Sequence, residues 1–180
     1  MINVILISLI FGISQKLADA VNEHGTVLFK GANIFFGIIF GISGSILISI
    51  DSTFAEFYLG LVLYWLIADK LDFLNHQLSG SIMILVALYN LNSSDINVLN
   101  IIFVISIFFL FKIVKNYLSA FNLQINYSFE KKIHHFIIAI ILGLWFSNWL
   151  ITISIILTIV GIMATIQVLK NKNNYHNCSF

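Results

Sequence analysis

Residues 27–50 read VLFKGANIFFGIIFGISGSILISI, a run in which Lys30 is the single ionisable side chain. A helix rises 1.5 Å per residue, so about twenty apolar residues cross the ~30 Å of bilayer hydrocarbon. The whole chain shares this character: 59% of its residues are hydrophobic, 9% are charged and none is proline. Soluble domains carry about 25% charged residues. Long apolar runs without short alternating segments therefore predict membrane-spanning helices rather than a barrel.

Six further runs of similar character accompany this one, and together they predict an all-α integral membrane bundle of seven transmembrane helices. We expect one domain over residues 1–169 and a polar, frayed tail over 170–180. Six crossings are the alternative, if residues 133–169 form one helix; that helix would be about 55 Å long, too long for a bilayer, so we expect a turn at Ser147-Asn148. The expected spans are Ile2–Leu17, Val27–Ile50, Thr53–Ala68, Leu74–Leu91, Val98–Val114, Ile133–Phe146 and Trp149–Leu169.

The lysines give the expected orientation. With seven crossings and Met1 outside, every lysine falls at or near one face of the membrane, whereas Asp51, Glu56 and Asp95 fall on the other as solvent-facing charges. The positive-inside rule then makes the lysine face cytoplasmic, with the N-terminus outside and the C-terminus inside a cell membrane. These lysines are Lys16, Lys30, Lys70, Lys112, Lys115, Lys131, Lys132, Lys170 and Lys172.

Several classes of protein are excluded by the same residues. A net charge of +1 argues against a nucleic-acid partner, which needs a dense basic surface. The single cysteine, Cys178, provides neither an internal disulfide nor a C-x-x-C motif. The sequence also lacks a phosphate-binding glycine loop and an H-E-x-x-H zinc helix.

Two segments gather ionisable groups at the expected cytoplasmic ends: KLADAVNEH, residues 16–24, and DKLDFLNH, residues 69–76. In a continuing helix, residues spaced i, i+3 and i+7 lie within a 60° arc, so each segment is expected to present one polar stripe. Carboxylates suit Mg²⁺ or Mn²⁺, and histidine transfers protons near neutral pH. The predicted metal ligands are Asp19, Glu23, Asp69 and Asp72, with His76 or His24 as acid or base and Lys16 and Lys70 contacting the phosphate-bearing cofactor or substrate.

The pattern Asp69-x-x-Asp72-x-x-x-His76 resembles the aspartate-rich motif of membrane prenyltransferases that make quinones and archaeal ether lipids. Asp19-x-x-x-Glu23 is similar to the second acidic element of that family. In the family, the D-x-x-D-x-x-x-D motif binds magnesium diphosphate, and the resemblance implies such chemistry for this stripe. The chain departs from the family in carrying His76 as the last ligand, Ala68 before the motif, the two elements in reversed order and too few residues for nine spans.

Three functions remain open at this point. The first is a metal-assisted enzyme acting on a lipid or prenyl phosphate at the cytoplasmic leaflet, where other lysines and His134 and His135 add positive charge. The second is a small cation- or proton-coupled transporter. The third is a membrane scaffold whose charges only set topology. Gly37 and Gly41 are expected to pack helices within the chain or to form a homodimer seam.

Overall fold

A computed structural model describes the chain except for residues 1, 23–24, 27, 92–95, 121–132 and 172–180. The described residues form seven α-helices, which confirms the all-α prediction. Their boundaries agree with the expected spans to within a few residues except near 22, 32 and 120. The helices are α1 (Ile2–Asn22), α2 (Ala32–Ile48), α3 (Ser52–Ile67), α4 (Leu74–Leu91), α5 (Val98–Ala120), α7 (Ile133–Trp145) and α8 (Trp149–Asn171).

Three of these helices are long and apolar enough to cross a membrane: Asn3–Asn22, Val98–Tyr117 and Trp149–Lys170. The helices Ala32–Ile48, Ser52–Ile67 and His134–Trp145 are apolar but shorter. Many large hydrophobic side chains, such as Leu85 and Leu99, are also exposed on the outside of the bundle. The chain is therefore a membrane protein in its character, and seven crossings with a fixed orientation stay a prediction.

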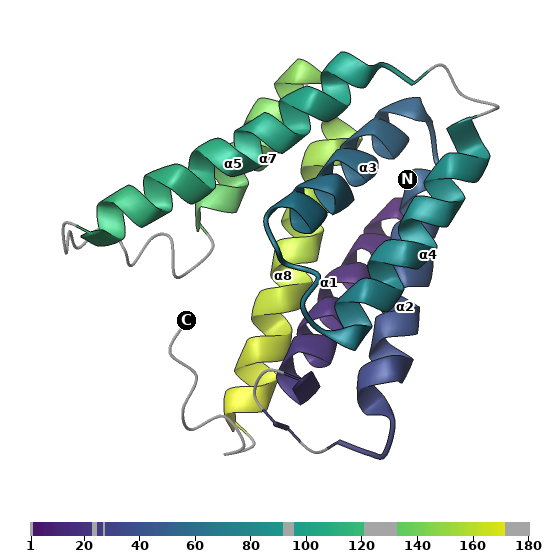
Figure 1. The fold of residues 1–180 in the computed structure, drawn as a ribbon, viewed down its shortest axis with the longest axis vertical. Coiled ribbons are helices and arrows are strands. Elements are labelled where there is room, and N and C mark those ends of the chain that lie inside the picture. The colour runs from purple at the N-terminus through teal and green to yellow at the C-terminus, as the bar shows by residue number, and fades with distance from the viewer. Residues whose placement is uncertain (1, 23–24, 27, 92–95, 121–132, 172–180) are drawn as a thin grey trace.

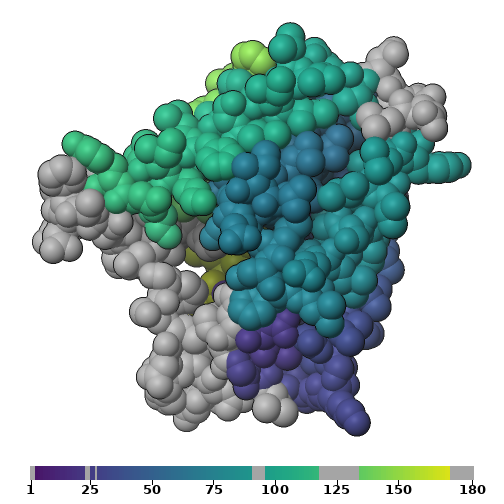
Figure 2. Space-filling model, viewed as in Figure 1, coloured from purple at the N-terminus to yellow at the C-terminus, as the bar shows by residue number. Residues whose placement is uncertain are grey.

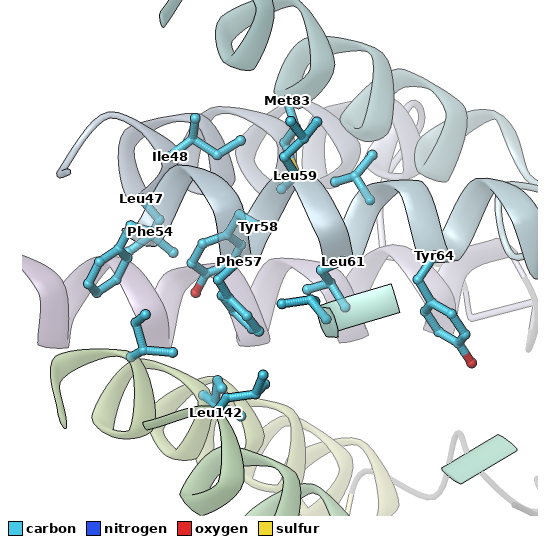
Figure 3. Close-up of a cluster of buried hydrophobic side chains, with 14 of the residues drawn as sticks. Leu47, Ile48, Phe54, Phe57, Tyr58, Leu59, Leu61, Tyr64, Met83 and Leu142 are labelled. Atoms are coloured by element: carbon cyan, nitrogen blue, oxygen red, sulfur yellow. The ribbon is translucent and has the colours of Figure 1, made fainter. Parts of the chain in front are cut away.

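The helices form two groups, and α3 and α8 each contact helices of both groups and so connect them (Figure 1). In the first group, α1 packs against α2 and α8, and α4 packs on α2. In the second, α5 lies along α3 and α7 along α8. Figure 3 shows the apolar core between them, where Phe54, Phe57 and Tyr58 of α3 lie near Leu142 of α7. In Figure 1, α5 leans away from α8 toward its C-terminal end.

Glycines allow the closest helix contacts. A Cβ atom at Gly37 would lie 3.0 Å from Cα of Asn75, and one at Gly41 would lie 3.0 Å from Cα of Ser79, both on α4. The small-residue stripe of α2 is thus used inside the chain, which is the first of its two expected roles. A homodimer through Gly37 and Gly41 would need to displace α4 from this surface.

The segment 69–76 does not continue α3 as a helix, so that expectation is wrong. Asp69 adopts a left-handed conformation (φ 56°) and ends the helix, with the N–H of Lys70 donating to the Trp65 carbonyl and that of Asp69 to Leu66. This is the Schellman pattern of helix termination, in which a left-handed residue reverses the chain. His76 consequently belongs to α4.

Ser147 (φ 50°) ends α7 in the same way: the N–H of Asn148 donates to the Gly143 carbonyl and that of Ser147 to Leu144. Helix α8 begins directly afterwards at Trp149. The predicted turn at Ser147-Asn148 is confirmed, and residues 133–169 are two helices rather than one.

Glu56 is not the solvent-facing charge that the sequence predicted. It is 3% exposed, and its carboxylate accepts hydrogen bonds from the Asn97 backbone N–H (2.6 Å) and the Asn100 side chain (2.7 Å). The Trp145 indole in turn donates to Asn100 and stacks on Phe103. These bonds tie α3, α5 and α7 together at one end, because a buried carboxylate needs hydrogen-bond donors.

Candidate functional site

A cavity of about 560 Å³ opens at the other end of α3, where α5 and α7 lie farther from α1 and α4. Figure 2 shows a recess bordered by α3, α4 and α5, with part of α8 visible at its bottom. All seven described helices contribute to its lining. Its volume is typical of a ligand pocket, for which 300–1,000 Å³ is the usual range.

The lining has two chemically different parts. Its deep wall is apolar and aromatic, whereas charged and polar side chains gather around the mouth. A cavity with this division suits an amphipathic ligand, whose chain is removed from water while its head meets polar groups. The deep wall includes Phe11, Phe40, Phe57, Tyr58, Leu61, Ile138, Ile155, Ile159 and Ile162, and the mouth includes Lys16, Asp19, Asp69, Lys70, Asp72, His76, Lys112, Lys115, Asn116, His134 and His135.

Asp19 and His76 meet at this mouth from different helices. Oδ1 of Asp19 lies 2.7 Å from Nε2 of His76, and both side chains are largely buried, at 17% and 13% exposed. Lys16 Nζ lies 3.7 Å from the other oxygen of Asp19, and Asp72 Oδ1 lies 3.5 Å from Nδ1 of His76. The ends of α1 and α4 therefore bring together four of the residues selected from the sequence.

Helix geometry explains why these side chains meet. Asp19 and Asn22 are three residues apart on α1 and share one face of it, which His76 and Asn75 contact from the start of α4. The Asn22 amide donates to Oδ1 of Asn75, which is fully buried. Two polar contacts thus connect α1 with α4.

The remaining predicted site residues have different outcomes. Asp69, Lys70 and Asp72 line the cavity from the loop before α4, because the turn at Asp69 directs the chain back across the mouth. The predictions for Glu23 and His24 fall outside the described residues.

The predicted metal site is not assembled in the described part of the chain. No group of three or more His, Cys, Asp or Glu side chains there has the geometry to hold a metal ion. Asp19 is instead oriented toward Lys16 and His76. Magnesium, however, is often held by one or two carboxylates together with substrate phosphates, so a preformed cluster is not required for it.

The opposite side of the mouth is basic and aromatic. Lys112, Lys115 and Asn116 reach it from α5, and His134 and His135 reach it from the start of α7. The two histidine rings lie 4.0 Å apart, and His134 stacks on Phe111 with a centroid separation of 6.1 Å. The sequence grouped these residues as a source of positive charge, and they face the same cavity as Asp19 and His76.

The sequence interpretation missed Tyr64 and Trp65, which line the cavity from α3. Both lie within an apolar run beside many phenylalanines and leucines. The residue spacing in such a run does not distinguish an aromatic side chain that lines a cavity from one that packs in the core. The one available signal was their position one to two helical turns before Asp69.

Comparisons of this chain with family models, with curated proteins and with solved structures find no match. The cavity and its side chains are therefore the basis for a functional assignment.

Proposed function

We propose that this protein is a membrane enzyme that hydrolyses a lipid or prenyl phosphate at the cytoplasmic leaflet. The observation that supports it best is the cavity, which combines an aromatic interior with the Asp19–His76 pair at its mouth. The apolar chain of the substrate lies among Phe11, Phe40 and Phe57, and the phosphate lies among the lysines and histidines.

In this proposal, Asp19 accepts the Nε2–H of His76 and holds that tautomer, so that Nδ1 is the basic nitrogen. His76 removes a proton from an attacking water, and the water oxygen bonds to phosphorus. The ester P–O bond then breaks, the leaving alkoxide takes a proton from solvent water to give the alcohol, and the protonated His76 releases its proton to solvent. Lys16 and Lys70 offset the negative charge that develops on the phosphoryl oxygens.

The test uses the full chain in phosphatidylcholine nanodiscs with two probes. Farnesyl phosphate reports turnover as released inorganic phosphate, and dodecylphosphonate, whose C–P bond is not hydrolysed, reports binding without turnover. We expect both phosphate release and saturable binding above empty nanodiscs. Saturable binding without phosphate release would contradict the enzymatic part, and loss of both would contradict the proposal as a whole.

We also propose that Mg²⁺ or Mn²⁺ enters this site together with the phosphate, through Asp69 and Asp72. Dodecylphosphonate affinity is expected to rise about tenfold with millimolar Mg²⁺, since a divalent cation bridges carboxylate and phosphate oxygens. The double substitution Asp69→Asn, Asp72→Asn should remove this increase, while Asp51→Asn, a change in the exposed N-cap of α3, should preserve it. An Mg²⁺ response equal in all three proteins would exclude these two aspartates as ligands.

We also propose that the chain crosses the membrane seven times, with its lysine-bearing end in the cytoplasm. Labelling with a membrane-impermeant maleimide tests it in intact cells. Cys178, the native cysteine, should react only after permeabilisation, whereas Ile50→Cys in a Cys178→Ser background should react from outside. Labelling of both positions from the same side would require an even number of crossings between them and would contradict the five that are expected.

A further inference from the structure

Tyr64 places a polar atom in an otherwise apolar stretch of the cavity. Its side chain is 9% exposed and lines the cavity from α3, and its ring stacks on Phe108 and meets Phe109 edge-on. Within the described part of the chain, its hydroxyl has no hydrogen-bond partner. In Figure 3 this hydroxyl points away from the α3 backbone and beyond the labelled core side chains. A tyrosine hydroxyl on a largely buried side chain normally finds a partner, so this one, which lines the cavity, is available to a ligand.

Lys112 supplies a cation to the lining of the same cavity. Its Nζ lies 5.9 Å from the centroid of the Phe109 ring, and the Tyr64 ring lies 5.2 Å from the same centroid. The Lys112 ammonium donates to the Ala68 carbonyl at 3.4 Å and pairs with no carboxylate among the described residues. A partly buried ammonium without a counter-ion attracts an anion.

From these two side chains we infer an oxyanion subsite, formed by the Tyr64 hydroxyl and the Lys112 ammonium, that binds the acidic head of the ligand. Both groups line the cavity and donate hydrogen bonds, so together they favour an anionic head over a neutral one and disfavour a cationic one. The inference rests on the proposed function, because it assigns the head-group contacts of the same cavity.

The position of the subsite also constrains the ligand. Tyr64 is five residues before Asp69, about 7.5 Å along a helix axis, and Lys112 donates to the carbonyl of Ala68 beside the loop, so the anion lies just inside the loop that crosses the mouth. Lys112 and Tyr64 belong to α5 and α3, while Asp19 and His76 belong to α1 and α4. The head group is therefore held from one side of the cavity and approached by the acid–base pair from the other.

The test measures dodecylphosphonate binding to the full chain in phosphatidylcholine nanodiscs. Tyr64→Phe keeps both ring contacts, and Lys112→Met keeps most of the aliphatic stem, so each removes mainly one donor. We expect each change to weaken binding roughly tenfold, the lower end of the range for a hydrogen bond to a charged group. The double variant should lose less than the product of the two factors, because both donors contact one anion.

Matched controls are Tyr89→Phe and Lys30→Met, both at exposed positions outside the cavity, which should bind like the parent protein. Dodecyltrimethylammonium and dodecanol test the charge preference, and inorganic phosphate tests whether the head binds without a chain. We expect the phosphonate to bind tightest and inorganic phosphate to compete only weakly.

Parent-like phosphonate binding by Tyr64→Phe and Lys112→Met would overturn the subsite and leave the proposed function standing. Equal binding of dodecyltrimethylammonium and dodecylphosphonate would also overturn the subsite. Failure of the parent protein to bind dodecylphosphonate would overturn both the subsite and the proposed function.

Discussion

Replacing His76 by alanine is expected to slow phosphate release from farnesyl phosphate by roughly 10²- to 10⁴-fold, the usual contribution of a general acid or base. The imidazole is the group in the described mouth that is both held at hydrogen-bond distance by a carboxylate and able to carry a proton near neutral pH. Dodecylphosphonate binding should change little, because His76 acts on the attacking water while the proposed head-group contacts come from Lys16, Lys70, Tyr64 and Lys112. Parallel measurements of turnover and binding in nanodiscs check this separation.

Asp19→Asn provides the second arm of the same experiment. Asparagine keeps the size of the side chain, and its amide can donate to the imidazole and favour the wrong tautomer, so turnover should again fall by more than tenfold. Asp72→Asn is the matched control, because Asp72 is 53% exposed and lies 3.5 Å from the imidazole, too far for a strong hydrogen bond. In the absence of Mg²⁺, Asp72→Asn should lower turnover by less than about threefold. Equal losses in the two variants would show that the Asp19–His76 contact has no particular role in turnover.

Loss of phosphate release in His76→Ala could also follow from disturbed packing. The contacts of His76 include Asp19 of α1 and the ring of Phe73, so the alanine variant removes packing and polar contacts as well as the imidazole. His76→Gln retains a hydrogen-bonding group without a titratable nitrogen and separates the two causes. Recovery of turnover in His76→Gln would contradict a proton-transfer role and favour a structural one.

The sequence was sufficient to predict the helices and to group Asp19 with His76 in one candidate site. Apolar run length determines where helices lie, and helical periodicity determines which side chains share a face, and both are local properties. Residues 16–24 and 69–76 were expected at the same face of the membrane, but the sequence placed His76 on an extension of α3 rather than on α4.

The parts that the sequence could not predict depend on contacts between distant segments. The helical extension after Ala68 failed because Asp69 adopts a left-handed conformation that is common for glycine but unusual for aspartate. Glu56 was assigned to solvent because its donors, Asn97 and Asn100, come from a helix more than forty residues later. Tyr64 could not be distinguished because the shape of a cavity is a property of the packed helices.

The largest effect on stability is expected at Gly12, where α1 crosses α8. A Cβ atom there would lie 2.1 Å from the backbone carbonyl oxygen of Thr158 and 2.8 Å from its carbonyl carbon. Gly12→Ala should therefore force the two helices apart and cost about 3 kcal/mol, at the upper end for overpacking. For a chain of this size, that corresponds to a fall in Tm of roughly 10 °C. Thermal unfolding in detergent, followed by size-exclusion chromatography, measures it.

Gly80→Ala is the control for the substitution itself. Its nearest neighbour is the flexible end of Leu71, at 3.2 Å, and alanine is the better helix former by about 0.5–1 kcal/mol. Its Tm should match or slightly exceed that of the parent. A Tm for Gly12→Ala within a few degrees of that of Gly80→Ala would contradict the close approach of α1 and α8.

Second-site substitutions identify the atom that clashes with the added Cβ in each glycine variant. At Gly143 the obstructing atom is a side-chain oxygen, Oγ1 of Thr152, at 1.9 Å, so Thr152→Ala should restore part of the stability lost in Gly143→Ala. At Gly12 the obstructing atom belongs to the backbone of residue 158, so Thr158→Ala should restore none. Because Thr158 also lines the cavity, the Gly12→Ala protein should bind dodecylphosphonate more weakly even below its Tm. The α1–α8 contact thus connects the stability of the bundle to the shape of the proposed binding site.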